Sequence, residues 1–278
     1  MTSGGTAARA VVAVDVRGVT KTFAAVEGAD IRALDGISLG VPQGEFTAIV
    51  GPSGSGKSTL LKIVAGLIPA SEGEVRILDE PVRAPSPKMS FVFQTPVLLP
   101  WRTVLENTLL PLEIAGRITA DAVDRGRALL ELVGLAGYEA RYPFEMSWGM
   151  QQRVAFTRAL IGRPQVLLLD EPFAALDAIT REEMNVELLR IWSEIGGSVV
   201  LVTHSIAEAV FLADRVVVLS ARQARTVGEH RVPFTRPRDL ALMATAEFAE
   251  LSGQVRQSLE KGYRPVRPTP AVHGDASR

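Results

Sequence analysis

Residues 51–59 combine glycines, hydroxyls and one lysine at a spacing that could hold a triphosphate. They fit the pattern G-x-x-x-x-G-K-[ST] at Gly51, Gly56, Lys57 and Ser58. Glycines let the backbone curl until successive N–H groups point at phosphate oxygens, and the following helix adds free donors at its start. We expect Lys57 to reach the β- and γ-phosphates and the Ser58 hydroxyl to ligate Mg²⁺. The predicted nucleotide contacts are Gly51, Pro52, Ser53, Gly54, Ser55, Gly56, Lys57, Ser58 and Thr59.

This motif by itself indicates a nucleoside triphosphate and leaves the reaction open. An ordinary Gly/Ser turn is the alternative, but such a turn gives no reason for Lys-Ser to follow the last glycine directly. Kinases, GTPases and motor proteins share the motif, so a second feature has to identify the chemistry.

Two adjacent carboxylates supply that feature. The apolar run 166–169 ends in Asp170 and Glu171, and a strand here would deliver both acids to the sheet edge where ligands bind. We expect Asp170 to hold Mg²⁺ through water and Glu171 to polarise the attacking water. Two solvated acids at a strand end are the alternative, which the upstream phosphate loop disfavours. The two motifs together predict hydrolysis of a nucleoside triphosphate.

Strands alternating with helices are predicted to place these groups at one sheet edge. A run of apolar residues predicts a buried strand at 46–50, and an apolar stripe predicts a helix at 58–67. Residues 103–161 have a mostly helical pattern, with a helix start at Thr119, so 95–160 is predicted to be a helical insertion. The fold class is therefore α/β with a parallel sheet core. The other predicted elements are strands at 11–19, 31–41, 74–78, 89–93, 166–169, 199–202 and 216–219, and a helix at 179–195.

The ends of the chain differ from this pattern. Residues 1–10 are small and polar and are predicted to be disordered, and residues 11–221 are predicted to form the main domain. The pattern weakens after about residue 222. We therefore expect 222–278 to be a C-terminal extension whose last part, 264–278, is a flexible tail rich in proline and charge.

Composition excludes several other classes. The 278 residues are 47% hydrophobic, enough for one large domain, and 30 basic against 31 acidic side chains give a net charge of −1. We therefore expect no nucleic-acid partner, which would require a basic surface. The lack of cysteine excludes disulfides and thiolate chemistry. We find no signal-peptide layout at the start and no run of roughly 20 apolar residues, so any membrane role is expected to depend on a partner.

A third motif narrows the class. Residues 146–153 read Met-Ser-Trp-Gly-Met-Gln-Gln-Arg, which is similar to the Leu-Ser-Gly-Gly-Gln signature of ABC (ATP-binding cassette) proteins and the Gln-Arg that follows it. Other marks of that family appear in order around it: Phe23, Gln94 in Phe-Gln-Thr-Pro, Asp177 in Ala-Leu-Asp, and His204 in Val-Thr-His-Ser. The chain resembles an ABC nucleotide-binding domain over about residues 11–221.

The resemblance implies a P-loop NTPase fold with an N-terminal antiparallel β region and an inserted helical subdomain. It implies that Phe23 stacks on adenine, that Gln94 contacts Mg²⁺ or the water, and that His204 reaches the γ-phosphate and holds Glu171 in place. Stacking on a base is worth about 1–3 kcal/mol in nucleic-acid complexes. A core phenylalanine, a solvated glutamine and a structural histidine are the alternatives.

The resemblance also implies a head-to-tail homodimer with two ATP molecules between the subunits. Ser147 and Gly149 would donate to the γ-phosphate bound on the opposite subunit, and Asp177 would combine helix capping with an interface role. Trp148 and Met150 depart from the signature, where glycine and glutamine are usual. An indole that points at the nucleotide would impair closure of the dimer, whereas one that points away would be tolerated.

Within the family, the chain resembles importers of the nitrate, sulfonate and taurine group in two segments, Leu-Pro-Trp-Arg-Thr-Val at 99–104 and Thr-His-Ser-Ile-x-Glu-Ala at 203–209. This implies permease subunits, a separate substrate-binding protein and a location at the cytoplasmic face of the cell membrane. The helical block and the segment Thr95–Trp101 would contact the permease, unless the apolar residues of this segment simply pack beneath the block.

Three rival interpretations stay open from the sequence. A soluble ABC ATPase acting on nucleic acid or ribosomes usually has two cassettes or long coiled-coil arms, and this chain has neither. An ATP-sensing module without turnover is favoured only by Trp148, and Glu171 argues against it. A metabolic kinase would have no need of residues 146–153.

Overall fold

The computed structural model describes residues 12–25, 28–174, 176–221 and 224–263. The predicted disordered start and the predicted flexible tail 264–278 lie outside the described residues. Within them, no helix is long and apolar enough to cross a membrane.

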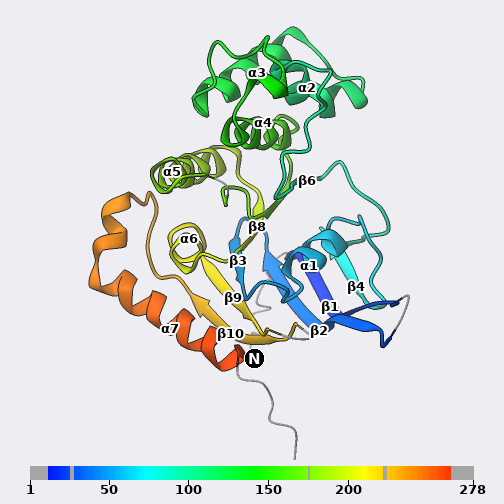
Figure 1. Ribbon diagram of the computed structural model, residues 1–278, viewed down its shortest axis with the longest axis vertical. Coiled ribbons are helices and arrows are strands. Elements are labelled where there is room, and N and C mark those ends of the chain that lie inside the picture. Colours follow the sequence, from blue (N-terminus) through cyan, green and yellow to red (C-terminus); the bar gives the residue numbers. More distant parts are fainter. Residues whose placement is uncertain (1–11, 26–27, 175, 222–223, 264–278) are drawn as a thin grey trace, which may run out of the picture.

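A six-stranded sheet forms the centre of the molecule, with the order β10-β9-β3-β8-β7-β6 (Figure 1). Adjacent strands of this sheet are parallel, except that β10 pairs antiparallel with β9. Every residue of β3, β7, β8 and β9 is buried, which accounts for their unbroken apolar runs and confirms the predicted parallel core. The strands are β3 (Phe46–Val50), β6 (Met89–Val92), β7 (Val166–Asp170), β8 (Ser198–Thr203), β9 (Arg215–Leu219) and β10 (Thr226–Arg231).

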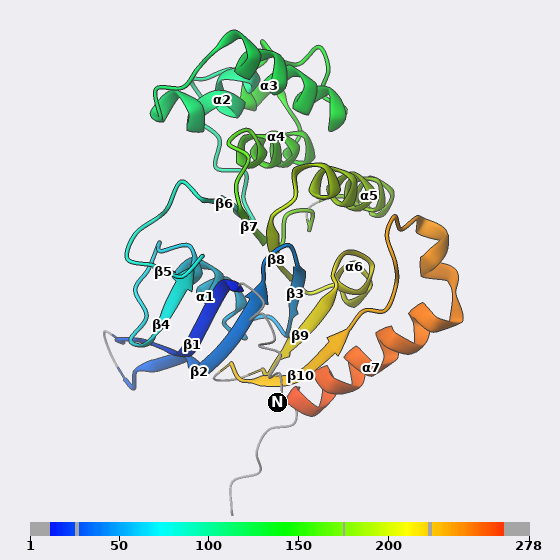
Figure 2. The ribbon, with the colours of Figure 1, turned by 180° about the vertical axis from the view of Figure 1, so that it is seen from behind.

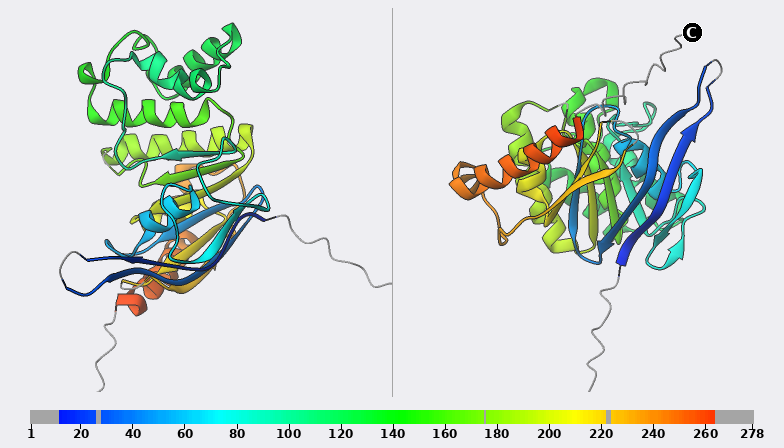
Figure 3. Two further views of the ribbon diagram at one scale, coloured as in Figure 1. Left: turned by 90° about the vertical axis from the view of Figure 1, so that its right-hand side faces the viewer. Right: turned by 90° about the horizontal axis from the view of Figure 1, so that it is seen from below.

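A second, antiparallel sheet has the order β2-β1-β4-β5 (Figure 2). Its long strands β1 and β2 extend beyond the other strands at the end where they form a hairpin (Figure 3). The helix α1 (Lys57–Val64) contributes Leu60 and Leu61 to the apolar cluster that joins this sheet to the central one. The strands are β1 (Val12–Phe23), β2 (Ile31–Pro42), β4 (Glu72–Ile77) and β5 (Glu80–Pro81).

The helical block is inserted between β6 and β7, as predicted, and lies above the sheet in Figure 1. It consists of α2 (Val104–Ile114), α3 (Ala120–Leu132), a 3₁₀ turn (Pro143–Glu145) and α4 (Trp148–Leu160). The side chain of Thr119 accepts a hydrogen bond from the Ala122 N–H, which confirms the predicted helix start.

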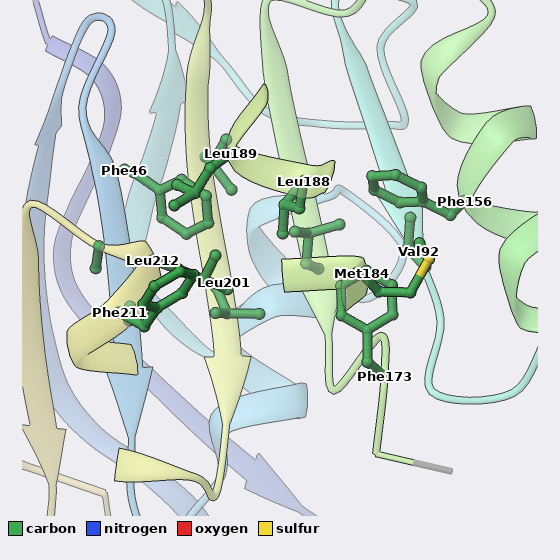
Figure 4. Close-up of a cluster of buried hydrophobic side chains, with 14 of the residues drawn as sticks. Phe46, Val92, Phe156, Phe173, Met184, Leu188, Leu189, Leu201, Phe211 and Leu212 are labelled. Atoms are coloured by element: carbon green, nitrogen blue, oxygen red, sulfur yellow. The ribbon is translucent and has the colours of Figure 1, made fainter. Parts of the chain in front are cut away.

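Large apolar side chains fill the space between the central sheet and helices α4, α5 (Ala178–Ile195) and α6 (Ile206–Leu212) (Figure 4). Phe156 of α4 meets Phe173 edge to face, with ring centroids 5.7 Å apart. This contact joins the helical block to the strand end that carries Asp170 and Glu171.

The C-terminal extension is more regular than its sequence pattern indicates. β10 adds a strand to the central sheet, and α7 (Ala246–Tyr263) packs against β10 and β9. Arg238 is buried and donates to the carbonyls of Phe211 and Ala213 at the end of α6. The boundary at residue 221 stays a prediction, but the segment after it is bonded to the core.

Candidate functional site

The phosphate loop connects the buried end of β3 to the start of α1. Gly56 has φ of +83° and caps the helix without a side-chain hydrogen bond. A Cβ at Gly56 would lie 2.7 Å from the carbonyl oxygen of Ala33, so both the backbone conformation and the space require glycine. The turn leaves the first N–H groups of α1 facing the cleft, where an anion would meet free donors.

Lys57 lies inside this curl. Its ammonium donates to the carbonyls of Gly51 at 2.8 Å and Pro52 at 2.9 Å, and the residue is 5% exposed. Burial lowers the pKa of Lys57, and the negative charges of Glu171 and Asp170 oppose that shift. The ammonium is therefore held where β- and γ-phosphate oxygens would replace the two carbonyls as acceptors.

Asp170 and Ser58 form a pair of hard oxygen ligands. The Ser58 hydroxyl donates to Asp170 Oδ1 at 2.7 Å, and burial raises the pKa of Asp170. Among the described residues, no group of three or more His, Cys, Asp or Glu side chains could hold a metal ion. Two oxygen ligands fit Mg²⁺, since that ion commonly takes one or two protein oxygens and completes its shell with phosphate and water.

Glu171 and His204 are brought together by the adjacent parallel strands β7 and β8. His204 Nδ1 lies 3.0 Å from Glu171 Oε2, and the two side chains are 56% and 17% exposed. Glu171 has φ of +47°, a left-handed conformation that is uncommon outside glycine, and its N–H donates to the Val202 carbonyl. Such strain is found at functional sites, where the surrounding structure holds it in place.

An open cleft of about 530 Å³ is lined by Lys57, Ser58, Glu171 and His204, whereas Gly51, Pro52 and Asp170 are not among its lining residues. Ala33 also lines the cleft, with its carbonyl oxygen close to Gly56, and no sequence motif signals it. Gln94 lines the cleft from an exposed position after β6. The lining residues are Ala33, Ser53, Gly54, Ser55, Gly56, Lys57, Ser58, Thr59, Gln94, Glu171 and His204.

Phe23 is not among the residues that line the cleft. Its ring is at the end of β1, is 41% exposed and has the Lys21 ammonium 5.1 Å from its centroid. The alternative of a core phenylalanine is therefore wrong, and adenine stacking by Phe23 stays a prediction.

The signature residues lie elsewhere, at the start of α4. Ser147 accepts a hydrogen bond from the Met150 N–H, and Asp177 caps α5 by accepting from the Thr180 N–H, as predicted. Neither these residues nor Gly149 line the cleft of their own chain. Trp148 is 48% exposed beside them.

Two charged residues near Glu171 and His204 were not singled out from the sequence. Arg181 lies in the first turn of α5, and Glu208 lies in the first turn of α6. The spacing of Ser205 and Glu208 fits a capping box, so a search for helix starts could have found Glu208.

Comparison with known proteins identifies the family. The family model described as ABC transporter matches residues 34–174. The chain belongs to the ABC transporter family. Similar relatives are the aliphatic sulfonates import ATP-binding protein SsuB of Bacillus cereus, 41% identical over 90% of this chain and 96% of the relative, and the nitrate import ATP-binding protein NrtD of Synechococcus elongatus, 44% identical over 88% and 90%. The taurine import ATP-binding protein TauB of Rhizobium johnstonii is 40% identical over 85% of this chain and 92% of the relative.

A solved structure agrees with these relatives. The dimeric post-hydrolysis ATP-binding cassette MJ0796, bound to ADP and Pi, is 34% identical and matches with a TM-score of 0.72 over 80% of this chain and 100% of that one. The predicted fold, ATP binding and the assignment as the ATPase subunit of an ABC importer are confirmed. A metabolic kinase is excluded.

Proposed function

We propose that this chain hydrolyses Mg²⁺-bound ATP in a closed homodimer and thereby drives import of a small oxyanion or sulfonate through a separate permease. The single observation that carries the proposal is the arrangement of Glu171, His204, Lys57 and Ser58 around one cleft. The names of the relatives, which import sulfonates, taurine and nitrate, support the substrate class.

The chemistry follows from the positions of these side chains. Glu171 accepts a proton from the water that attacks the γ-phosphorus, and His204 keeps the carboxylate aimed at that water. Lys57 donates to the phosphate oxygens as the bond to the leaving ADP breaks. Ser58 and Asp170 would hold Mg²⁺, with Gln94 near the same edge, and the ion would neutralise charge on the phosphates.

The dimer completes the site in this proposal. Ser147 and Gly149 stand at a helix start away from their own cleft, so only a partner's cleft would receive their donors. The dimeric cassette MJ0796 supports this arrangement. Trp148 is the first residue of that helix and is 48% exposed, so a closed dimer has to accommodate its indole.

The permease is proposed to dock on two segments, Thr95–Trp101 and the turn that carries Tyr142 and Phe144. Val97 and Trp101 are exposed, and the rings of Tyr142 and Phe144 stack with centroids 5.5 Å apart. Arg158 donates to the carbonyls of Pro96 and Val97 and so ties the segment to α4. Exposed aromatic side chains on a supported segment suit a partner helix. A membrane-peripheral location on the cytoplasmic side and a separate substrate-binding protein follow from the same proposal.

Steady-state ATP hydrolysis at increasing protein concentration, with Glu171→Gln alongside, tests the core of this proposal. Turnover that rises more than linearly and vanishes in the variant is the expected result. ATP binding without turnover, even with the permease added, would favour an ATP-sensing module instead.

A further inference from the structure

Two charged side chains beside the cleft belong to no motif that the mechanism uses. Arg181 and Glu208 lie in the first turns of α5 and α6, helices that pack against each other. α5 follows the turn after Glu171, and α6 starts two residues after His204. Both side chains therefore act on the elements that carry the catalytic pair, without lining the cleft.

Arg181 holds the turn between Glu171 and Asp177. Its guanidinium donates to the carbonyls of Phe173 at 3.2 Å, Ala174 at 3.3 Å and Leu176 at 2.7 Å. A planar guanidinium can serve several diverging carbonyls at once, whereas an ammonium on a flexible stem cannot reproduce that fork. One side chain thus fixes the backbone at three described positions of this turn.

Glu208 is buried in the first turn of α6, close to His204. The residue is 7% exposed, and its N–H donates to the Ser205 hydroxyl at 3.2 Å, which closes the first turn of α6. Burial raises the pKa of its carboxyl, while a hydrogen bond from Thr203 and the charges of Arg181 and His204 favour the ionised form. Thr203 is the residue directly before His204, so this hydrogen bond ties the buried carboxyl to the strand end that carries the histidine.

We propose that Arg181 and Glu208 are positioning residues for ATP hydrolysis, with Arg181 fixing the turn that joins Glu171 to Asp177 and the Glu208 carboxyl fixing Thr203, the residue before His204. The assignment rests on the proposed function. In the proposed dimer Asp177 faces the partner subunit, so Arg181 links that surface to the base Glu171. Hydrolysis should therefore depend on both residues, and ATP affinity should not.

The test compares Arg181→Met, Arg181→Lys and Glu208→Gln with the wild-type chain. Matched controls are Arg190→Met and Glu194→Gln, an exposed ion pair on the same helix α5. A fluorescent ATP analogue gives the dissociation constant, steady-state hydrolysis gives kcat and KM, and urea unfolding gives the stability of each variant.

We expect dissociation constants within about twofold of wild type and a kcat that falls roughly 100-fold in Arg181→Met, since a misplacement of about 1 Å costs that much. Arg181→Lys should restore folding stability but not kcat, because it lacks the fork. Glu208→Gln keeps the shape of the side chain, so kcat should fall by a smaller factor than in Arg181→Met. Both control variants should match the wild type.

Two results would overturn the assignment. One is a wild-type kcat in Arg181→Lys and Glu208→Gln; the other is a loss of kcat that follows a matching loss of ATP affinity and folding stability, which indicates a purely structural role. A wild-type chain without turnover, even with its permease, would instead overturn the proposed function and this assignment with it.

Discussion

Two regions of the molecule differ in how far their side chains are already bonded within the chain. One is the floor of the cleft, with Lys57 and Asp170, and the other is the edge of the helical block, with Trp148 and Trp101. On the floor, Lys57 and Asp170 are buried, and each is already bonded to a group of the same loop or its neighbour. At the edge, Trp148 is 48% exposed and Trp101 is 71% exposed. The chain by itself holds in place the groups proposed to bind phosphate, whereas Trp148 and Trp101, which are proposed to meet other chains, are largely exposed.

This difference has a physical cause. Buried charges have to be paired or hydrogen-bonded, so the floor is tied to the packing of the central sheet. Exposed aromatic side chains gain free energy only when a partner covers them. Variants on the floor should therefore affect a single chain, and variants at the edge should act only in assemblies.

The largest effect is expected from Glu171→Gln. The amide keeps the shape of the carboxylate but cannot accept the proton of the attacking water, so kcat should fall about 10²–10⁴-fold. ATP binding should persist, and the variant should accumulate as a closed dimer, measured by size-exclusion chromatography with ATP. Glu182→Gln on the exposed face of α5 is the control. Unchanged turnover in Glu171→Gln would exclude Glu171 as the base.

Lys57→Ala should mainly weaken ATP binding. A hydrogen bond to a charged group is worth about 1.5–3 kcal/mol, so affinity should fall roughly 10- to 150-fold. Isothermal titration with ATP measures this, and Lys88→Ala, which removes an exposed ion pair with Glu80, is the control. Normal affinity in the Lys57 variant would contradict the assignment of the phosphate loop.

Trp101→Ala should separate the edge from the floor. Basal hydrolysis should stay at the wild-type rate, while binding to the permease should weaken by about 2 kcal/mol, or about 30-fold, as for a central interface aromatic residue. Pull-down with the purified permease and its stimulation of hydrolysis measure the effect. Ile114→Ala, at the far end of α2, is the control. If the Trp101 variant unfolds instead, the segment packs beneath the block rather than binding a partner.

Gly149→Ala probes the boundary between the two regions. An added Cβ would lie 2.7 Å from Leu176 Cδ2, beside Asp177, so the side chain of Leu176 has to move. Overpacking typically costs about 1–3 kcal/mol, and we expect turnover to fall about tenfold with unchanged ATP affinity. Gly162→Ala has open space around the added atom and serves as the control. Equal turnover in the two variants would argue against close packing of the signature on Leu176.

Phe23→Ala should have the smallest effect. Because the ring is partly exposed, stacking on adenine should contribute about 1 kcal/mol, so KM for ATP should rise about fivefold. Phe23→Tyr keeps a ring and should retain the wild-type KM. If KM for GTP and ATP rise equally little in the alanine variant, the ring does not contact the base.

The sequence predicted best those parts of the fold and the site whose residues are neighbours in the chain. Lys57, Ser58 and their glycines form one continuous motif whose neighbours in the chain are also its neighbours in space, so the sequence predicted the loop and its strand and helix. Buried parallel strands produce unbroken apolar runs, and therefore the sheet core was predicted as well. The strand β10 was missed because its residues are only partly buried, whereas the helix α7 was missed although Phe248, Leu251 and Val255 form a buried stripe at helical spacing.

The sequence by itself determined which residue types this protein could use for ATP chemistry. The family resemblance predicted that His204 holds Glu171, but only the tertiary structure brings these two residues, 33 positions apart in the chain, to 3.0 Å from each other. The tertiary structure also decided that Arg181 holds the turn between Glu171 and Asp177, and that Glu208 is buried close to His204. The physical reason is that pairing of β7 with β8, and packing of α5 on α6, bring together residues whose separation in the chain carries no signal of contact.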